Sequence, residues 1–156
     1  MKVMNPVLPG FNPDPSLVRV GDDYYIATST FEWFPGICIH HSKDLVNWEI
    51  LSYALTDETK FDIKGMDTAC GIWAPNLTYD NGTFYLIYTI VYTNRHRFKD
   101  THNFMVTASD PKGPWSDPIP LNKMGFDLLS SMIRTVPSGW SICFLTIGWI
   151  INVSVV

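Results

Sequence analysis

Apolar and polar residues alternate along residues 16–20, as expected for a strand with one buried face. The polar turn Gly21-Asp22-Asp23 follows, and residues 24–29 have the pattern of a second strand, rich in aromatic side chains. Residues 37–42 form a third apolar run, and a fourth fades by Leu55. The pattern therefore predicts four short strands joined by tight turns.

The same pattern recurs 60 residues later, where Asp14-Pro15-Ser16-Leu17 aligns with Ala74-Pro75-Asn76-Leu77. The alignment continues without a gap to the next predicted strand, and residues 42–48 are echoed by residues 109–115 at a slightly longer offset. Each copy ends with a tryptophan close to its last strand. Repeated four-stranded units with closely spaced turns are typical of β-propeller blades. We therefore expect an all-β fold, a partial β-propeller of about two blades and the start of a third.

Two prolines flank Asp14 and restrict the backbone on both sides of its carboxylate. Because the innermost strands of a propeller surround one axis, Asp14 and Trp73, which stand at equivalent starts of successive blades, should face the same pocket. The loop at residues 30–36 carries three aromatic rings and one carboxylate, and it forms either a ligand wall or a loop folded onto the core. The alternative for Asp14 is a turn-capping aspartate.

Several other polar residues lie outside this pattern. His40 and His41 have no third ligand at metal spacing, so we expect one histidine inside in a hydrogen bond, the other outside, and no metal or other cofactor. The basic residues Arg95, His96, Arg97 and Lys99 lie between two predicted strands, and we expect them on a solvated rim.

Composition narrows the function classes. The net charge of −4 argues against nucleic-acid partners and against anionic membranes. Aromatic residues make up 14% of the chain, which fits both a strand-rich core and a sugar-binding surface. Cys38, Cys70 and Cys143 are widely spaced and form no CxxC pair, so we expect reduced, buried thiols. With no apolar signal segment at the N-terminus, the sequence predicts a cytoplasmic protein.

The pattern breaks after Asp127, which stands where a third copy should open. Residues 128–156 lose the turn spacing and carry no charge after Arg134, and we expect no strand hairpin there. A membrane anchor is one explanation, but the apolar run is of marginal length and is interrupted by Gly148 and Asn152. Codons can be chosen so that the neighbouring frame encodes a blade opening: Ser-Leu, an acidic glycine turn and an aromatic strand. Our hypothesis is that residues 1–127 belong to the propeller and that residues 128–156 are an out-of-frame tail.

Several motifs resemble the β-xylosidases of glycoside hydrolase family 43. These motifs are Asn12-Pro13-Asp14-Pro15-Ser16, residues 29–36, residues 40–48, Trp73-Ala74-Pro75 and Gly125-Phe126-Asp127. The resemblance covers residues 1–127 and implies a five-bladed propeller. It implies inverting hydrolysis of terminal β-1,4-xylosyl units, often with arabinofuranosidase activity, on xylo-oligosaccharide or arabinosyl substrates, and full-length relatives that are homo-oligomers.

The resemblance also assigns roles to four residues. Asp14 corresponds to the general base that activates water, and Asp127 to the aspartate that orients and tunes the general acid. The alternative for Asp127 is a structural aspartate, since only three residues carry that match. Phe31 and Trp73 match pocket-lining aromatic residues. The general acid of the family is a glutamate on a later blade with no counterpart in this sequence, so we expect the 156-residue chain alone to be inactive or at most a weak sugar binder.

Overall fold

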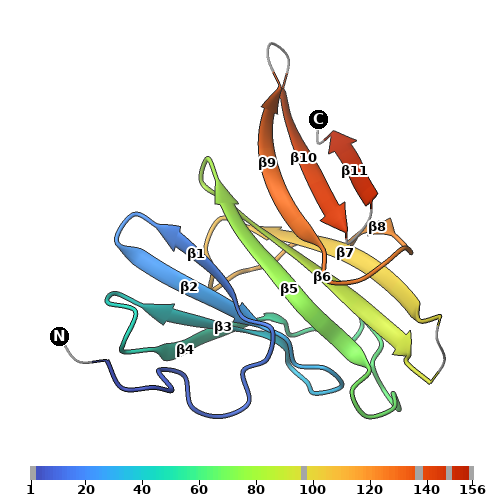
Figure 1. Ribbon diagram of the computed structural model, residues 1–156, viewed down its shortest axis with the longest axis horizontal. Coiled ribbons are helices and arrows are strands. Elements are labelled where there is room, and N and C mark those ends of the chain that lie inside the picture. Colours follow the sequence, from blue (N-terminus) through green and yellow to red (C-terminus); the bar gives the residue numbers. More distant parts are fainter. Residues whose placement is uncertain (1–2, 96–97, 136–138, 147–148, 155–156) are drawn as a thin grey trace.

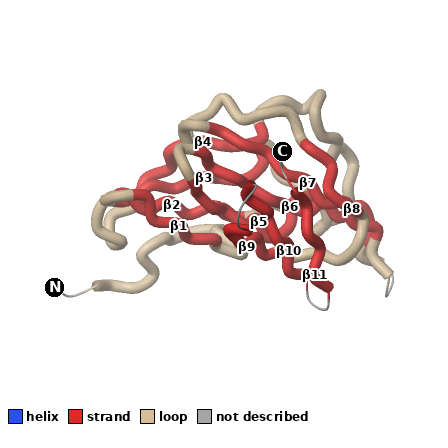
Figure 2. Tube along the Cα trace, turned by 90° about the horizontal axis from the view of Figure 1, so that it is seen from above, coloured by secondary structure: helices blue, strands red, loops and turns tan. Residues whose placement is uncertain are grey.

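The computed structural model describes residues 3–95, 98–135, 139–146 and 149–154, with side chains up to Leu128. Every regular element in these ranges is a β-strand, as Figure 2 shows. No helix in this part of the chain is long and apolar enough to cross a membrane. The predicted all-β fold is confirmed.

The first sheet follows chain order and is antiparallel throughout. Its strands are β1 (Ser16–Val20), β2 (Asp23–Thr28), β3 (Gly36–Ser42) and β4 (Glu49–Leu55). In β1 the alternation read from the sequence is realised, because Val18 and Val20 pack against the core while Leu17 is 56% exposed.

The second sheet repeats the first. Its strands are β5 (Gly71–Asp80), β6 (Thr83–Thr93), β7 (Asp100–Ala108) and β8 (Ile119–Asn122), in the order β5-β6-β7-β8. The turn between β5 and β6 is Asn81-Gly82, and both residues have positive φ, as a tight hairpin requires. Because β1 ends at Val20 and β5 at Asp80, the predicted 60-residue repeat is confirmed at the level of strands.

The core lies between these two sheets, which Figure 1 shows side by side. Ala27, Ile37 and Ile39 of the first sheet pack with Ile72 and Leu86 of the second, and each is fully buried. Burying one such aliphatic side chain stabilises the fold by roughly 1.5–3 kcal/mol. This apolar contact fixes how the starts of the two repeats face each other.

Two hydrogen bonds join the two sheets, one between the inner strands β1 and β5 and one between the outer strand β4 and the segment after β7. At the inner end, where β1 lies beside β5, the Leu77 backbone N donates to Ser16 Oγ at 2.9 Å. At the outer end, Ser52 Oγ donates to the Pro111 carbonyl oxygen at 2.7 Å. The relative position of the two blades is thus fixed by directional contacts as well as by packing.

A third sheet follows Asp127, contrary to the sequence-based expectation of no hairpin. Strands β9 (Leu129–Thr135), β10 (Gly139–Thr146) and β11 (Trp149–Ser154) pair antiparallel, and β9 lies beside β5. The physical reason is that isoleucine, valine, tryptophan and phenylalanine favour strands even without strict alternation. The reading-frame hypothesis concerns the gene and stays a prediction.

The histidine pair in β3 differs from its prediction in one respect. His40 is 3% exposed, so its inside position is confirmed, whereas His41 is the more exposed of the two but half-buried. The hydrogen bonds, however, belong to the outer ring: His41 pairs with Asp23 at 2.6 Å and with Glu49 at 3.2 Å, whereas both ring nitrogens of His40 are buried without a partner. The inner histidine is therefore held by packing alone.

Candidate active site

Asp14 stands just before β1 and is tied to the end of β2. Its Oδ2 accepts a hydrogen bond from Ser29 Oγ at 2.7 Å, and the Ser29 backbone N donates to the Pro13 carbonyl oxygen at 3.1 Å. Ser29 is 1% exposed, whereas Asp14 is exposed. A buried serine thus orients one oxygen of a carboxylate whose other oxygen can face solvent.

Phe31 is fixed to the second blade through its backbone. Its N donates to the Ile72 carbonyl oxygen at 3.0 Å, and the Ile72 N donates back to the Phe31 oxygen at 2.9 Å. Gly71 permits this close approach because a Cβ there would lie 2.6 Å from the Phe31 carbonyl carbon. The pair of bonds places the first aromatic ring of the site against the start of β5.

Four aromatic rings form a continuous row beside Asp14. Phe31 lies between Phe11, with ring centroids 5.9 Å apart, and Trp73, with centroids 6.5 Å apart. Trp73 meets Phe126 edge-to-face at 5.3 Å, and its indole Nε1 donates to the Ala69 carbonyl oxygen at 2.9 Å. The aromatic row therefore joins the starts of all three repeats.

Asp127 follows Phe126 and is half-buried. Burial raises the pKa of its carboxyl, and the negative charge of Asp14 raises the pKa further. The two carboxylates are therefore close enough to interact, although they lie 113 positions apart in the sequence. Ring contacts thus link Phe31 to Trp73 and Trp73 to Phe126, and Asp127 interacts with Asp14; the roles of these residues stay predictions.

The backbone of the site is strained at three positions. Asp14, Phe31 and Asp127 have φ values of 52°, 49° and 56°, in the left-handed region that side chains other than glycine rarely adopt. Each such residue costs on the order of 1–3 kcal/mol and persists only where surrounding contacts hold it. Other non-glycine residues of the chain share this conformation away from the site, so positive φ alone does not mark a functional residue here.

A sequence profile described as Glycosyl hydrolases family 43 matches residues 3–130. The chain belongs to glycosyl hydrolase family 43. A xylosidase/arabinosidase 43B of Humicola insolens is 57% identical over 126 residues, and a β-xylosidase of Bacillus subtilis (strain 168) is 56% identical over 127 residues. Each alignment covers 81% of this chain but only 23% and 24% of those family 43 relatives, so the chain spans about a quarter of their length.

Solved structures of the family share the fold. The crystal structure of xylan β-1,4-xylosidase from Bacillus halodurans C-125 superposes with a TM-score of 0.82 at 50% identity, over 94% of this chain and 31% of that one. A family 43 protein of Bacillus licheniformis, BlXynB carrying K247S, gives a TM-score of 0.80 at 39% identity, over 92% of this chain and 28% of that one. The two four-stranded sheets are blades of the family's five-bladed β-propeller.

Lys99 is a residue of this family 43 site whose place the sequence did not indicate. Its ammonium lies 5.9 Å from the centroid of the Trp73 ring and 5.5 Å from that of Phe126, not on a solvated rim as expected. The reason is cation–π attraction to two neighbouring ring faces, which spacing alone does not encode. Arg95 does lie on the exposed rim, in a two-bond ion pair with Asp67, and His96 and Arg97 lie outside the described residues.

The aromatic loop at residues 30–36 divides between the two expected roles. Phe31 faces the site, whereas Phe34 stacks on Phe61 at 6.1 Å and Trp33 is 67% exposed. Glu32 accepts a hydrogen bond from the Ala69 backbone N at 3.1 Å, so its carboxylate braces the loop. Of the three rings, Phe31 is therefore the one with a described contact to Trp73.

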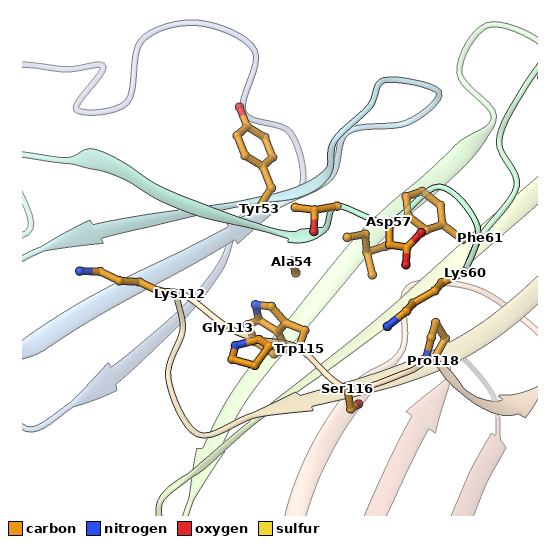
Figure 3. A pocket seen from close by; sticks show the side chains of 13 residues that line it. Tyr53, Ala54, Asp57, Lys60, Phe61, Lys112, Gly113, Trp115, Ser116 and Pro118 are labelled. Atoms are coloured by element: carbon orange, nitrogen blue, oxygen red, sulfur yellow. The ribbon is translucent and has the colours of Figure 1, made fainter.

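Other hollows lie away from these carboxylates. The cavity in Figure 3, about 320 Å³, opens beside the outer strand β4, with the Lys60 side chain extending toward Trp115. A second hollow of about 510 Å³ lies at the opposite strand ends, around His41 and Lys43. Within the described residues, no three His, Cys, Asp or Glu side chains are grouped to hold a metal. The open surface beside Asp14 is therefore the place where acid–base chemistry is best supported.

Proposed function

We propose that the protein containing these residues is an exo-acting glycoside hydrolase that removes terminal β-1,4-xylosyl units from xylo-oligosaccharides with inversion. The observation that carries the proposal is the pairing of Asp14 with Asp127 beside the aromatic row. Asp14 acts as the general base, and Asp127 orients and tunes the general acid. The names of the relatives, which include xylosidases and arabinosidases, support a pentose substrate. Terminal arabinosyl units are therefore a second candidate for the sugar that is removed.

Inversion requires two carboxyl groups on opposite faces of the sugar. The base activates a water molecule on one face while the acid protonates the departing oxygen on the other, with about 6.5–9.5 Å between the carboxyls. Asp14 is suited to the first task because Ser29 holds one of its oxygens and the residue is exposed to water. The apolar face of the pentose ring would pack on Phe31 and Trp73.

Asp127 is suited to tuning rather than to proton transfer. A carboxylic acid that must stay protonated near neutral pH needs burial or a neighbouring negative charge to raise its pKa. Asp127 is half-buried and already interacts with Asp14, so a third carboxyl brought beside it would feel the same repulsion. This carboxyl would be the family's glutamate.

For the 156 residues alone we propose no measurable turnover. General acid catalysis contributes typically 10²- to 10⁴-fold, and our proposal places the family's glutamate outside these 156 residues. An alternative function is a non-catalytic fragment with at most weak sugar binding, since the rings of Phe31 and Trp73 could contact a sugar without the glutamate.

The test compares the 156-residue chain with the full-length protein, expressed from a gene whose reading frame after Asp127 is restored. Both are assayed on 4-nitrophenyl β-D-xyloside, and proton NMR identifies the anomer of the released xylose. We expect turnover and α-xylose from the full-length protein only, and no turnover after Asp14→Asn, a change that keeps the side-chain shape and tolerates positive φ. Asp22→Asn, at an exposed turn, is the matched control. An inert full-length protein, or an active Asp14→Asn variant, would refute the assignment.

A further inference from the structure

The loop that carries Asp127 is held by one buried amide side chain. Asn103, in β7, is 1% exposed. Its Nδ2 donates to Asn122 Oδ1 at 2.9 Å, to the Met124 carbonyl oxygen at 3.0 Å and, more weakly, to the Gly125 carbonyl oxygen at 3.4 Å. These acceptors occupy the segment between the end of β8 and Asp127.

A second buried residue fixes the orientation of that amide. Thr89 lies directly opposite Asn103 in the β6–β7 pairing and is fully buried. Its Oγ1 donates to Asn103 Oδ1 at 2.6 Å, so the amide oxygen is occupied by the hydroxyl and the amide nitrogen must point at the loop. The two side chains form one directional network in the interior of the second blade.

The loop needs this support because Asp127, unlike Gly125, adopts a backbone conformation that its side chain disfavours. Gly125 has a φ of 70° and Asp127 one of 56°, with Phe126 placed edge-on to Trp73 between them. Asn122 adds one local bond, since its Oδ1 also accepts from the Met124 backbone N at 2.9 Å. Without the amide of Asn103, the carbonyl oxygens of Met124 and Gly125 would lose their protein donor and the loop would relax.

We propose that Asn103, oriented by Thr89, is a positioning residue that sets where Asp127 stands relative to the general acid. This inference rests on the proposed function, because it assigns Asp127 the task of raising the acid's pKa. When Asp127 moves away, its repulsion weakens, the pKa of the acid falls, and the acid loses its proton at a lower pH. A misplacement of about 1 Å at such a site costs on the order of 10²-fold in rate.

The experiment uses the full-length protein with Asn103→Leu, which keeps the branch at Cγ and removes every hydrogen bond of the amide. Two substrates are compared: xylobiose, whose leaving sugar needs protonation, and 2,4-dinitrophenyl β-D-xyloside, whose leaving group departs without it. We expect kcat/KM to fall about 10- to 100-fold for xylobiose and by clearly less for the activated xyloside. The basic limb of the pH profile should move to lower pH.

Two further variants make the result decisive. Thr89→Val removes only the hydroxyl that orients the amide and should give the same changes at smaller size, so it decides the question if Asn103→Leu does not fold. Thr101→Val is the matched buried control, because Thr101 lies in β7 with Asn103 and is 4% exposed. It should leave the pH profile and the ratio of kcat/KM for the two substrates unchanged. Equal losses on both substrates with an unmoved pH profile would overturn the inference, whereas an unmutated protein inert on both substrates would overturn the proposed function itself.

Discussion

Replacing Gly71 by alanine tests how closely the two blades must approach at the site. Gly71 has a φ of 86°, and an added Cβ would overlap the Phe31 carbonyl group, with 2.6 Å to its carbon and 2.9 Å to the Glu32 nitrogen. Both contacts are with backbone atoms, so no side-chain rotation can relieve them. The peptide after Phe31 must move until the contacts reach at least 3.4 Å, a shift of close to 1 Å.

Gly82 offers a matched control for this substitution. It has the same φ of 86°, but a Cβ there meets nothing within 4 Å. Gly82→Ala therefore carries only the cost of a left-handed alanine, about 1–2 kcal/mol. Gly71→Ala carries this cost and the loss of the two Phe31–Ile72 hydrogen bonds, worth about 0.5–1.5 kcal/mol each. We expect Gly71→Ala to be less stable than Gly82→Ala by about 1–3 kcal/mol.

The two variants should differ more in activity than in stability. Urea unfolding of both gives the difference in free energy of unfolding, and kcat/KM of the full-length protein on 4-nitrophenyl β-D-xyloside gives the functional effect. Because Phe31 shifts by close to 1 Å, we expect Gly71→Ala to lose on the order of 10²-fold in kcat/KM while Gly82→Ala stays near the unmutated value. If the two variants are equally stable and equally active, the close approach of the blades has no role in the site.

Three further predictions concern charged or titratable side chains. Burial lowers the pKa of His40 below 6.5, so the unfolded state binds the proton more readily and stability is lost as pH falls below about 6.5. His40→Phe should therefore reduce the change in melting temperature between about pH 7.5 and pH 5. An unchanged dependence of melting temperature on pH would contradict this. The pKa of Asp127 is raised, so its ionisation opposes folding as pH rises through that pKa. Asp127→Asn should therefore have a higher melting temperature than the unmutated chain at about pH 7, and this gain should vanish below about pH 3.8. A gain that persists below that pH would point to another cause. Lys99→Met keeps most of the aliphatic side chain and removes the charge, so KM for xylobiose should rise about 2- to 5-fold. Arg95→Gln is the control and should leave KM unchanged. Equal KM values for the two variants would place Lys99 outside the site.

The blade architecture was predictable because its signals are local and repeated. Turn residues at Gly21-Asp22 and Asn81-Gly82 mark equivalent hairpins, and the fixed offset between them reveals the repeat without any alignment to other proteins. The interaction of Asp14 with Asp127 agrees with the same repeat, since equivalent positions in a propeller share one axis. Contacts that follow from symmetry can be predicted in this way from one sequence.

Other contacts depend on distances that spacing does not contain. Lys99 is one of several basic residues in a loop, and only the coordinates distinguish it from Arg95. Phe61 and Ile63 lie in a stretch rich in charged residues, yet both are buried in the core, because two apolar side chains can turn inward while their charged neighbours stay in water. Asn103 carries no motif, and its importance comes from three acceptors that converge on it from a separate segment.

The paired main-chain bonds between Phe31 and Ile72 have a consequence for how a substrate could enter. They tie a loop of one blade to the first strand of the next, so this wall cannot swing outward unless both amide protons lose their partners. A sugar would therefore bind to a preformed surface, and its binding would not have to supply the free energy of closing a lid on that side. Any gate over this surface would have to come from a different part of the protein.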